Sequence, residues 1–235
     1  MQIAIVPARG GSKRIPRKNI RTFGGRPMLA WPIRAARASG LFDEVVVSTD
    51  DDEIARIAEA EGALTPFRRP ARLSDDIART REVINHALRD AEARHGCRVS
   101  ALCCVYATAA MITPDDLVMA RAALDNSAGT DFVFAAAQYP HPVHRAMLRR
   151  DDGGVEMLFP EHAASRSQDL PEALHDAGLF YWGRRDAFLE GRRMFSERAV
   201  PFVLPRSRAL DIDTTEDWDI AEALFSRFGP VDGAA

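Results

Sequence analysis

The stretch PARGGSKRIPRKN, residues 7–19, follows directly on the apolar run QIAIV, residues 2–6. The apolar run is predicted to be a short buried strand, so the stretch after it is the loop at the carboxyl end of that strand. Six basic and no acidic side chains lie between Arg9 and Arg21, around Gly10, Gly11 and Ser12. Glycine lets a ligand approach the backbone, and inward N–H groups beside cations form an anion cradle. The sequence therefore predicts a phosphate-binding loop.

The use of lysine strengthens this interpretation. The chain has 31 Lys plus Arg, and its two lysines, Lys13 and Lys18, both lie in this loop. Lysine is a compact point charge whereas arginine is a flat fork, so a site can require one and not accept the other. The alternative is a solvated basic loop. The Walker spacing GxxxxGK[ST] and the dinucleotide pattern GxGxxG are both absent from this loop.

PARGGSKRIPRKN resembles the CTP-binding signature of the cytidylyltransferases that activate nonulosonic acids, the CMP-sialic acid synthetases and their relatives. The segment RSQDLPEALHDAGLFYW, residues 166–182, is most similar to the pseudaminic acid branch of that group. At residues 106–109 the chain has YATA where sialic acid enzymes commonly have QPTS, and Tyr-Ala-Thr is again similar to the pseudaminic branch. The resemblance implies a Rossmann-like nucleotidyltransferase sheet. It also implies a CTP site made by residues of the first loop and of later segments: Ala8, Arg9, Gly10, Gly11, Ser12, Lys13, Asn19, Arg69, Ala78, Thr80 and Thr108.

Bulk properties agree with a cytosolic globular protein. The chain has 235 residues, enough for one domain with a sizeable core, and a net charge of −3 that favours neither nucleic acid nor a membrane surface. Three cysteines, an odd number, argue against a disulfide framework. We expect a single nucleotidyltransferase domain over residues 1–235, interrupted by an inserted arm at about 140–180.

Apolar strands alternate with amphipathic helices over roughly the first 140 residues, which predicts βαβ units. The expected fold is a three-layer α/β arrangement around a mostly parallel sheet. Strands are expected at 2–6, 44–48, 100–106, 130–138 and 200–204. Helices are expected at 27–39, 52–61, 74–94, from 113 onward, and at 216–228. The segment 141–160 is predicted to be a hairpin with its turn at Asp152-Gly153.

Asp50 and the arginine pair Arg68-Arg69 each have two interpretations. Asp50 follows the second strand and is either a residue of the ligand site, as at the carboxyl ends of open α/β sheets, or a helix N-cap. The resemblance implies that Arg69 faces the cytosine ring, with Ala78 and Thr80 beside it. A surface ion pair would explain the arginine pair Arg68-Arg69 equally well.

The sequence DID, residues 211–213, predicts a metal site. In an extended chain Asp211 and Asp213 point to the same face, where their charges repel unless a cation lies between them. Mg²⁺ takes one or two carboxylates together with phosphate oxygens and water. The alternative is a pair of caps for the next helix, but Thr214 or Thr215 could cap it unaided. The family resemblance also makes this pair its metal-binding residues.

The inserted arm is the part through which members of the resembled family dimerise and reach over the sugar. Arg166 and Gln168 could grip a carboxylate and a hydroxyl, because arginine binds carboxylates in a forked way. A polar surface strand is the alternative. His175 is assigned as a sugar contact, although surface histidines are common and the histidines show no metal spacing.

Together these features predict transfer of CMP from CTP to a nine-carbon α-keto acid sugar, most similar to the pseudaminic acid enzymes, by a cytosolic homodimer. Arg9, Lys13 and Lys18 would stabilise the triphosphate and its leaving group, Asn19 would contact the ribose or base, and Asp211 would act with Mg²⁺ in catalysis. Two alternatives remain: activation of sialic, legionaminic or 3-deoxy-manno-octulosonic acid, and a non-catalytic sugar-nucleotide-binding protein. The sequence identifies no general base.

Overall fold

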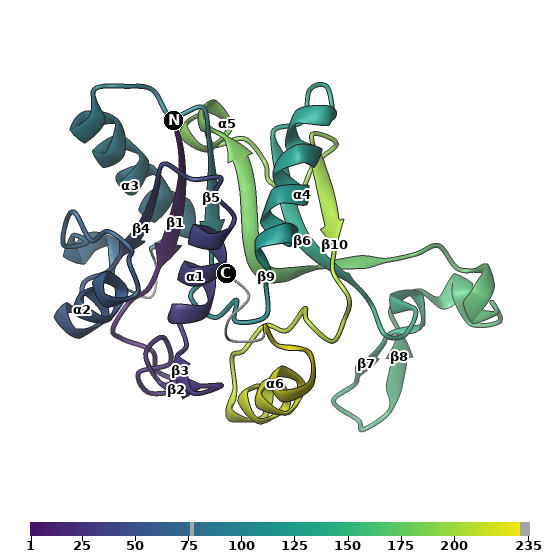
Figure 1. Ribbon diagram of the computed structural model, residues 1–235. Coiled ribbons are helices and arrows are strands. Elements are labelled where there is room, and N and C mark those ends of the chain that lie inside the picture. The colour runs from purple at the N-terminus through teal and green to yellow at the C-terminus, as the bar shows by residue number, and fades with distance from the viewer. Residues whose placement is uncertain (76–77, 231–235) are drawn as a thin grey trace.

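The computed structural model describes residues 1–75 and 78–230, which are built around one six-stranded sheet (Figure 1). The strand order is β10-β6-β9-β5-β1-β4, and every neighbouring pair is parallel except those that β9 makes with β5 and β6. The predicted mostly parallel sheet is confirmed, with β9 as an antiparallel strand in its interior. The strands of this sheet are β1 (Gln2–Pro7), β4 (Glu44–Ser48), β5 (Ala101–Val105), β6 (Phe132–Gln138), β9 (Leu174–Arg184) and β10 (Ala199–Val203).

Helices cover both faces of the sheet because side chains of a strand alternate between its faces. In β1, Ala4 and Val6 belong to the core on one face, where α1 and α4 also pack. Ile3 and Ile5 belong to the core on the other face, which is covered by α3 and α5. These two cores give the three predicted layers. The helices are α1 (Ala30–Ala38), α2 (Asp52–Ala60), α3 (Thr80–His95), α4 (Pro114–Asn126), α5 (Arg185–Leu189) and α6 (Thr215–Phe228).

Two predicted helix starts are wrong. The helix expected from Pro27 begins at Ala30, because Pro27 belongs to a small hairpin of β2 (Thr22–Phe23) and β3 (Arg26–Pro27). Its turn is made by Gly24-Gly25 at φ values of 56° and 85°, which glycine adopts readily. The helix expected from residues 74–76 begins at Thr80, after a short 3₁₀ turn, η1 (Ala71–Leu73); residue 76 lies outside the described residues.

A third core cluster brings the two ends of the chain together. Ile15 of the basic loop and Ile212 of the DID sequence are both buried, each 1% exposed, in a cluster that also contains Trp218 of α6. Phe23 contacts Trp218 edge to face with ring centroids 5.2 Å apart, and the indole N–H of Trp31 donates to the Phe23 carbonyl at 2.9 Å. The basic loop and the DID sequence therefore lie side by side, although almost two hundred residues separate them.

Residues 139–173 leave the end of β6 as an arm that projects from the body and returns into β9 (Figure 1). Its hairpin, β7 (Met147–Arg149) with β8 (Val155–Met157), confirms the predicted antiparallel pair, with Gly153 at φ 83° in the turn. The rest of the arm holds the 3₁₀ turns η2 (Val143–Arg145), η3 (Pro160–His162) and η4 (Ser167–Asp169). Within residues 1–75 and 78–230, none of the helices combines the length and apolarity that crossing a membrane requires.

Candidate active site

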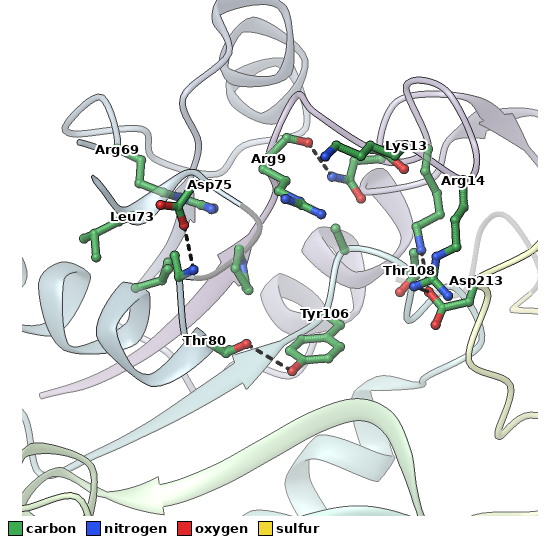
Figure 2. A pocket seen from close by; sticks show the side chains of 17 residues that line it. Arg9, Lys13, Arg14, Arg69, Leu73, Asp75, Thr80, Tyr106, Thr108 and Asp213 are labelled. Carbon is green, nitrogen blue, oxygen red and sulfur yellow. Dashed lines mark hydrogen bonds and ion pairs between the residues drawn. The ribbon is translucent and has the colours of Figure 1, made fainter. Parts of the chain in front are cut away.

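A cavity of about 610 Å³ opens at the carboxyl ends of β1 and β5 (Figure 2). Ten of the residues predicted from the sequence line this cavity: Arg9, Ser12, Lys13, Lys18, Asn19, Arg69, Ala78, Thr80, Thr108 and Asp213. They come from the basic loop, the segment before α3, the end of β5 and the DID sequence. The topology therefore gathers four separate stretches of the chain at one site, as expected for the carboxyl edge of an open α/β sheet.

The basic loop is braced from inside. The amide nitrogen of Asn19, 9% exposed, donates to the carbonyl of Arg9 at 2.9 Å, and the Asn19 carbonyl accepts from the Leu29 N–H at 2.9 Å. Arg17 adopts a left-handed φ of 56°, which is uncommon for a residue with a side chain. Its guanidinium pairs with Asp51 and Glu53 at the start of α2. These contacts fix the loop so that its cations face the cavity.

The N-cap interpretation of Asp50 is wrong, because the neighbouring Asp51 caps α2. The Asp51 carboxylate accepts from the N–H groups of Glu53 and Ile54, each at 2.9 Å. Hydrogen bonding from Arg17 holds the pKa of Asp51 below its usual value. Asp50 instead accepts from the N–H of Gly10 at 3.0 Å, so it holds the basic loop against the end of β4. A Cβ on Gly10 would lie 2.7 Å from Asp51, which explains why glycine stands there.

The DID sequence lies beside the basic loop at the edge of the cavity. The Lys18 ammonium lies 3.3 Å from an Asp213 carboxylate oxygen and donates to the Ile212 carbonyl. Arg14 reaches the same Asp213 oxygen at 2.9 Å. The cap interpretation of the two aspartates is wrong, because Thr214 caps α6 in a capping box with Asp217. Asp211 and Asp213 are thus available for another role.

Asp211 does not line the cavity directly but lies beside Gly178 of β9. Gly178 has φ 63°, and a Cβ built there would lie 3.2 Å from the Asp211 carboxyl group. Partial desolvation and the negative charge of Asp213 raise the pKa of Asp211 above its usual value. Two carboxylates that repel in this way gain stability when a cation binds between them.

The donor set fits Mg²⁺ bound together with a phosphate ligand. Among the described residues, no group of three or more His, Cys, Asp or Glu side chains is arranged to hold a metal ion. Mg²⁺ does not require such a group, because it is usually held by one or two carboxylates and completes its shell with phosphate oxygens and water. Asp211 and Asp213 supply oxygen ligands of this kind beside a loop built for phosphate.

The wall of the cavity away from the DID sequence contains Arg69, Thr80 and Tyr106 (Figure 2). Arg69 is 7% exposed, and its guanidinium donates to the hydroxyl of Ser48 at 3.1 Å and to the Ser48 carbonyl. Burial lowers the pKa of Arg69. The adjacent Arg68 makes a surface ion pair with Asp52, as the alternative interpretation expects, whereas Arg69 lines the cavity. The Thr80 hydroxyl lies 3.4 Å from the hydroxyl of Tyr106 on the same wall.

Several cavity residues were missed from the sequence. Tyr106 lines the cavity, and burial raises its pKa to about 12, so its phenol is a neutral hydroxyl at physiological pH. Asp75 also lines it and accepts from the N–H of Ala78, three residues further along the chain, at 2.7 Å. Arg14 could have been found from its place in the basic loop.

The residues predicted to bind sugar do not line this cavity. Arg166 precedes the 3₁₀ turn η4 in the arm and Gln168 lies within it, so the segment is a turn and not the alternative surface strand. His175 packs its ring 4.9 Å from that of Tyr139. It lines a separate groove of about 370 Å³ beside β6 and β9. Ala8, Gly10 and Gly11 support the loop without lining the cavity.

Comparisons with known proteins agree with this geometry. A model of the cytidylyltransferase family matches residues 3–222. The pseudaminic acid cytidylyltransferase of Campylobacter jejuni is 42% identical over 223 residues, which cover 95% of each chain. The CMP-N,N'-diacetyllegionaminic acid synthase of the same organism is 30% identical over 224 residues, covering 95% of this chain and 94% of that one.

A solved structure shows the same fold. It is that of CMP:2-keto-3-deoxy-manno-octonic acid synthetase complexed with CTP, and it matches with a TM-score of 0.65 at 16% sequence identity. The match covers 96% of this chain and 98% of the other. With the match of the family model over nearly the whole chain, these findings show that the protein belongs to the cytidylyltransferase family of nucleotidyltransferases.

Proposed function

We propose that this protein transfers CMP from CTP to pseudaminic acid, with release of pyrophosphate. One observation carries the proposal: Lys18 of the basic loop and Asp213 of the DID sequence line the same cavity as an ion pair, 3.3 Å apart. A triphosphate needs cations, and a divalent metal needs carboxylates; this arrangement offers both at one place. The similarity to the Campylobacter jejuni enzyme, 42% against 30% for the legionaminic acid synthase, favours pseudaminic acid as the sugar.

The reaction would be an in-line displacement. The anomeric hydroxyl of the sugar attacks the α-phosphorus, a P–O bond forms, and the bond to the β-phosphate oxygen breaks as pyrophosphate leaves. The protein's part is positioning and neutralisation of charge. Arg9, Lys13 and Lys18 would hold the phosphate oxygens, and Ser12, which also lines the cavity, would add its hydroxyl.

Asp211 and Asp213 would hold Mg²⁺ in this proposal. When bound, the ion neutralises phosphate charge and polarises the reacting phosphorus. Asp213 also pairs with Lys18 and Arg14. Of the two aspartates, Asp211, whose pKa is raised, is the one that would accept the proton of the sugar hydroxyl.

The opposite wall would bind the nucleoside. Arg69 and the backbone near Ala78 offer donors and acceptors to the edge of the base, and Thr80 and Thr108 offer hydroxyls. Asn19, which is bonded to Arg9, fixes the loop beside the ribose. These roles match those that the family resemblance implies.

The proposal includes a homodimer in the cytoplasm. The arm exposes apolar side chains, with Met147 61%, Leu148 54% and Val155 65% exposed, which is unusual for a surface that stays in water. Arg166 and Gln168 lie in the same arm and would meet the sugar in the partner's site. Light scattering on the purified protein tests this point. A monomer at all concentrations would contradict the dimer and any contribution of a partner subunit to the site.

The experiment that tests the function is pyrophosphate release from CTP and Mg²⁺ with a panel of sugar acids. We expect release with pseudaminic acid and much less with N-acetylneuraminic, legionaminic and 3-deoxy-manno-octulosonic acids. Release with another sugar alone would contradict the assigned substrate and keep the class. If no sugar supports release while CTP still binds, the protein is a binding module.

A further inference from the structure

The segment that carries Asp211 and Asp213 has no helix or strand of its own. Residues 204–213 connect the end of β10 to the start of α6 as turns and extended chain. Its first residue is tied by the Leu204 N–H to the Ala136 carbonyl at 2.9 Å, and its last by the Asp213 N–H to Asp217 at 3.0 Å. A metal site needs its ligands held in place. Burial of Ile212 holds the segment between the two aspartates, and the part of the segment before them has an anchor of its own.

Arg208 makes that anchor through a forked ion pair. Its two terminal nitrogens reach the two carboxylate oxygens of Asp116, at 2.5 Å and 3.1 Å. One of these nitrogens also donates to the carbonyl of Met111 at 3.3 Å. The Asp116 side chain is 3% exposed and that of Arg208 20%, so water does little to screen the pair. A bidentate arginine fixes direction as well as distance.

The partner of Arg208 stands at the start of α4, the helix that follows the loop lining the cavity. Asp116 accepts from the N–H of Thr113 at 2.8 Å and so closes the capping box at the start of α4. The loop before this helix descends from β5 and contains Thr108, which lines the cavity. The Arg208 fork therefore ties the nucleotide wall to the DID sequence three residues further along the chain.

A second buried acid offers a comparison within the same molecule. The Asp131 side chain is 2% exposed, and Arg198 forks onto it at 2.5 Å and 3.0 Å. Asp131 lies just before β6, at the amino edge of the sheet, opposite the cavity. Both acids are buried and held by an arginine fork, although Arg198 is 49% exposed against 20% for Arg208, and Asp131 also pairs with Arg192. They differ in what they hold, because only the Arg208 pair adjoins the cavity and the DID sequence.

We propose that Arg208 is a positioning residue, which through its fork on Asp116 sets the place of Asp211 and Asp213 and thereby the affinity of the site for a divalent cation. The inference rests on the proposed function, because it takes these two aspartates as the metal pair. Groups that orient metal ligands from outside the coordination shell typically change metal affinity by about 10- to 100-fold when removed. A change of that size is expected here.

The test measures Mn²⁺ binding to the whole protein by electron paramagnetic resonance, with Mn²⁺ alone as the probe. Arg208→Ala and Asp116→Asn are expected to raise the dissociation constant for Mn²⁺ by about tenfold or more. CTP binding in EDTA should stay unchanged. Arg208→Lys keeps the charge and loses the fork, so it should fold and show an intermediate effect. The matched control Asp131→Asn should lose stability without weakening Mn²⁺ binding.

Hydrogen exchange provides the second measurement. The amides of residues 209–214 should exchange faster in Arg208→Lys and Arg208→Ala than in the wild type, and not in Asp131→Asn. Wild-type Mn²⁺ affinity in both Arg208 variants, or equal weakening by Asp131→Asn, would overturn the inference. If Asp211→Asn leaves Mn²⁺ binding unchanged, the metal pair itself is wrong, and that variant distinguishes this failure from the failure of the Arg208 role.

Discussion

The two edges of the sheet use charge in opposite ways. At the amino edge, buried acids are enclosed by arginines: Arg94 binds Glu44, whose side chain is 3% exposed, and Arg198 forks onto Asp131, whose side chain is 2% exposed. At the carboxyl edge, the Asp213 side chain is 36% exposed, pairs with Lys18 and lines a cavity. The comparison shows that these charges at the amino edge hold elements of the fold together, whereas Asp213 and Lys18 at the carboxyl edge stay accessible to a ligand.

The strongest way to break this comparison is Asp211→Asn. The substitution keeps the shape of the side chain and removes one of the two proposed metal ligands. We expect turnover to fall by about 1000-fold, the upper range for loss of one electrostatic group at a reacting centre, with an unchanged thermal midpoint. Pyrophosphate release with saturating Mg²⁺ measures the first and calorimetry the second. Asp219→Asn, on the exposed face of α6, is the control; a wild-type rate in Asp211→Asn would remove the metal role.

Lys18→Ala should have the next largest effect. Its ammonium is 17% exposed and lies between Asp213 and the cavity, so we expect a fall in kcat of about 100-fold. Arg14→Ala should lose much less, because the Arg14 side chain is 66% exposed and solvent screens it. Steady-state kinetics of both variants ranks the two cations. An equal fall in kcat for both variants, or no fall for Lys18→Ala, would favour the interpretation of a solvated basic loop.

Gly178→Ala tests the contact between β9 and Asp211 at the carboxyl edge. The added Cβ would lie 3.2 Å from the Asp211 carboxyl group, so Asp211 must move. We expect a fall in kcat of about tenfold, an order-of-magnitude figure for a small displacement of a catalytic group. Gly96→Ala at the end of α3 has a similar φ, 61° against 63°, with open space around its Cβ. Both variants should lose similar stability, and equal kcat values for both would show that contact with Asp211 is unimportant.

Asp131→Asn tests the amino edge and should affect stability alone. Removing the charge leaves two arginines without their buried partner, at a cost of about 2 kcal/mol because both arginines are partly exposed. Hydrogen bonding from Arg198 and Arg192 lowers the pKa of Asp131. Its contribution is therefore present above the unfolded-state pKa of about 3.9 and is lost as the pH falls through the lower folded-state value.

Urea unfolding of the wild type and of Asp131→Asn at pH values from 6 downward checks this prediction, where about 4 is the expected onset of the loss. The difference in unfolding free energy between the two proteins should shrink below that onset. A constant difference would mean that Asp131 titrates alike in the folded and unfolded chain. A change in kcat at neutral pH would show that the amino edge is coupled to catalysis.

Much of the fold could be predicted because the chain follows local rules. Helix α4 begins at Thr113 with Pro114 and acids in its first turn, as its sequence predicts. The missed start of α1 has a local cause as well, since Gly24-Gly25 makes a hairpin that the Pro27 signal concealed. The place of β9 could not be predicted, because a strand's neighbours are chosen by tertiary packing and not by its own residues.

The residues of the site also fall into two groups, those that the local sequence identifies and those that depend on tertiary packing. Gly, Lys and the DID pair carry their chemistry in residue type and spacing, so Lys18 and Asp213 could each be assigned to the site before any coordinates, although their ion pair could not. Tyr106 could not be assigned, because its role depends on facing Thr80 across two elements. The capping role of Asp51 could not be separated from Asp50, since adjacent aspartates are equivalent in sequence and differ only in direction. Long-range partners such as Arg208 and Asp116 carry no signal in a single sequence.

The central claim is that the basic loop and the DID sequence enclose CTP and a divalent cation between them. Crystals grown with CTP and Mn²⁺ and measured at a wavelength sensitive to manganese test this claim directly. The account predicts an anomalous peak bound by Asp211 and Asp213, with triphosphate oxygens on Arg9 and Lys18. A nucleotide bound elsewhere, or a manganese peak away from both aspartates, would contradict it.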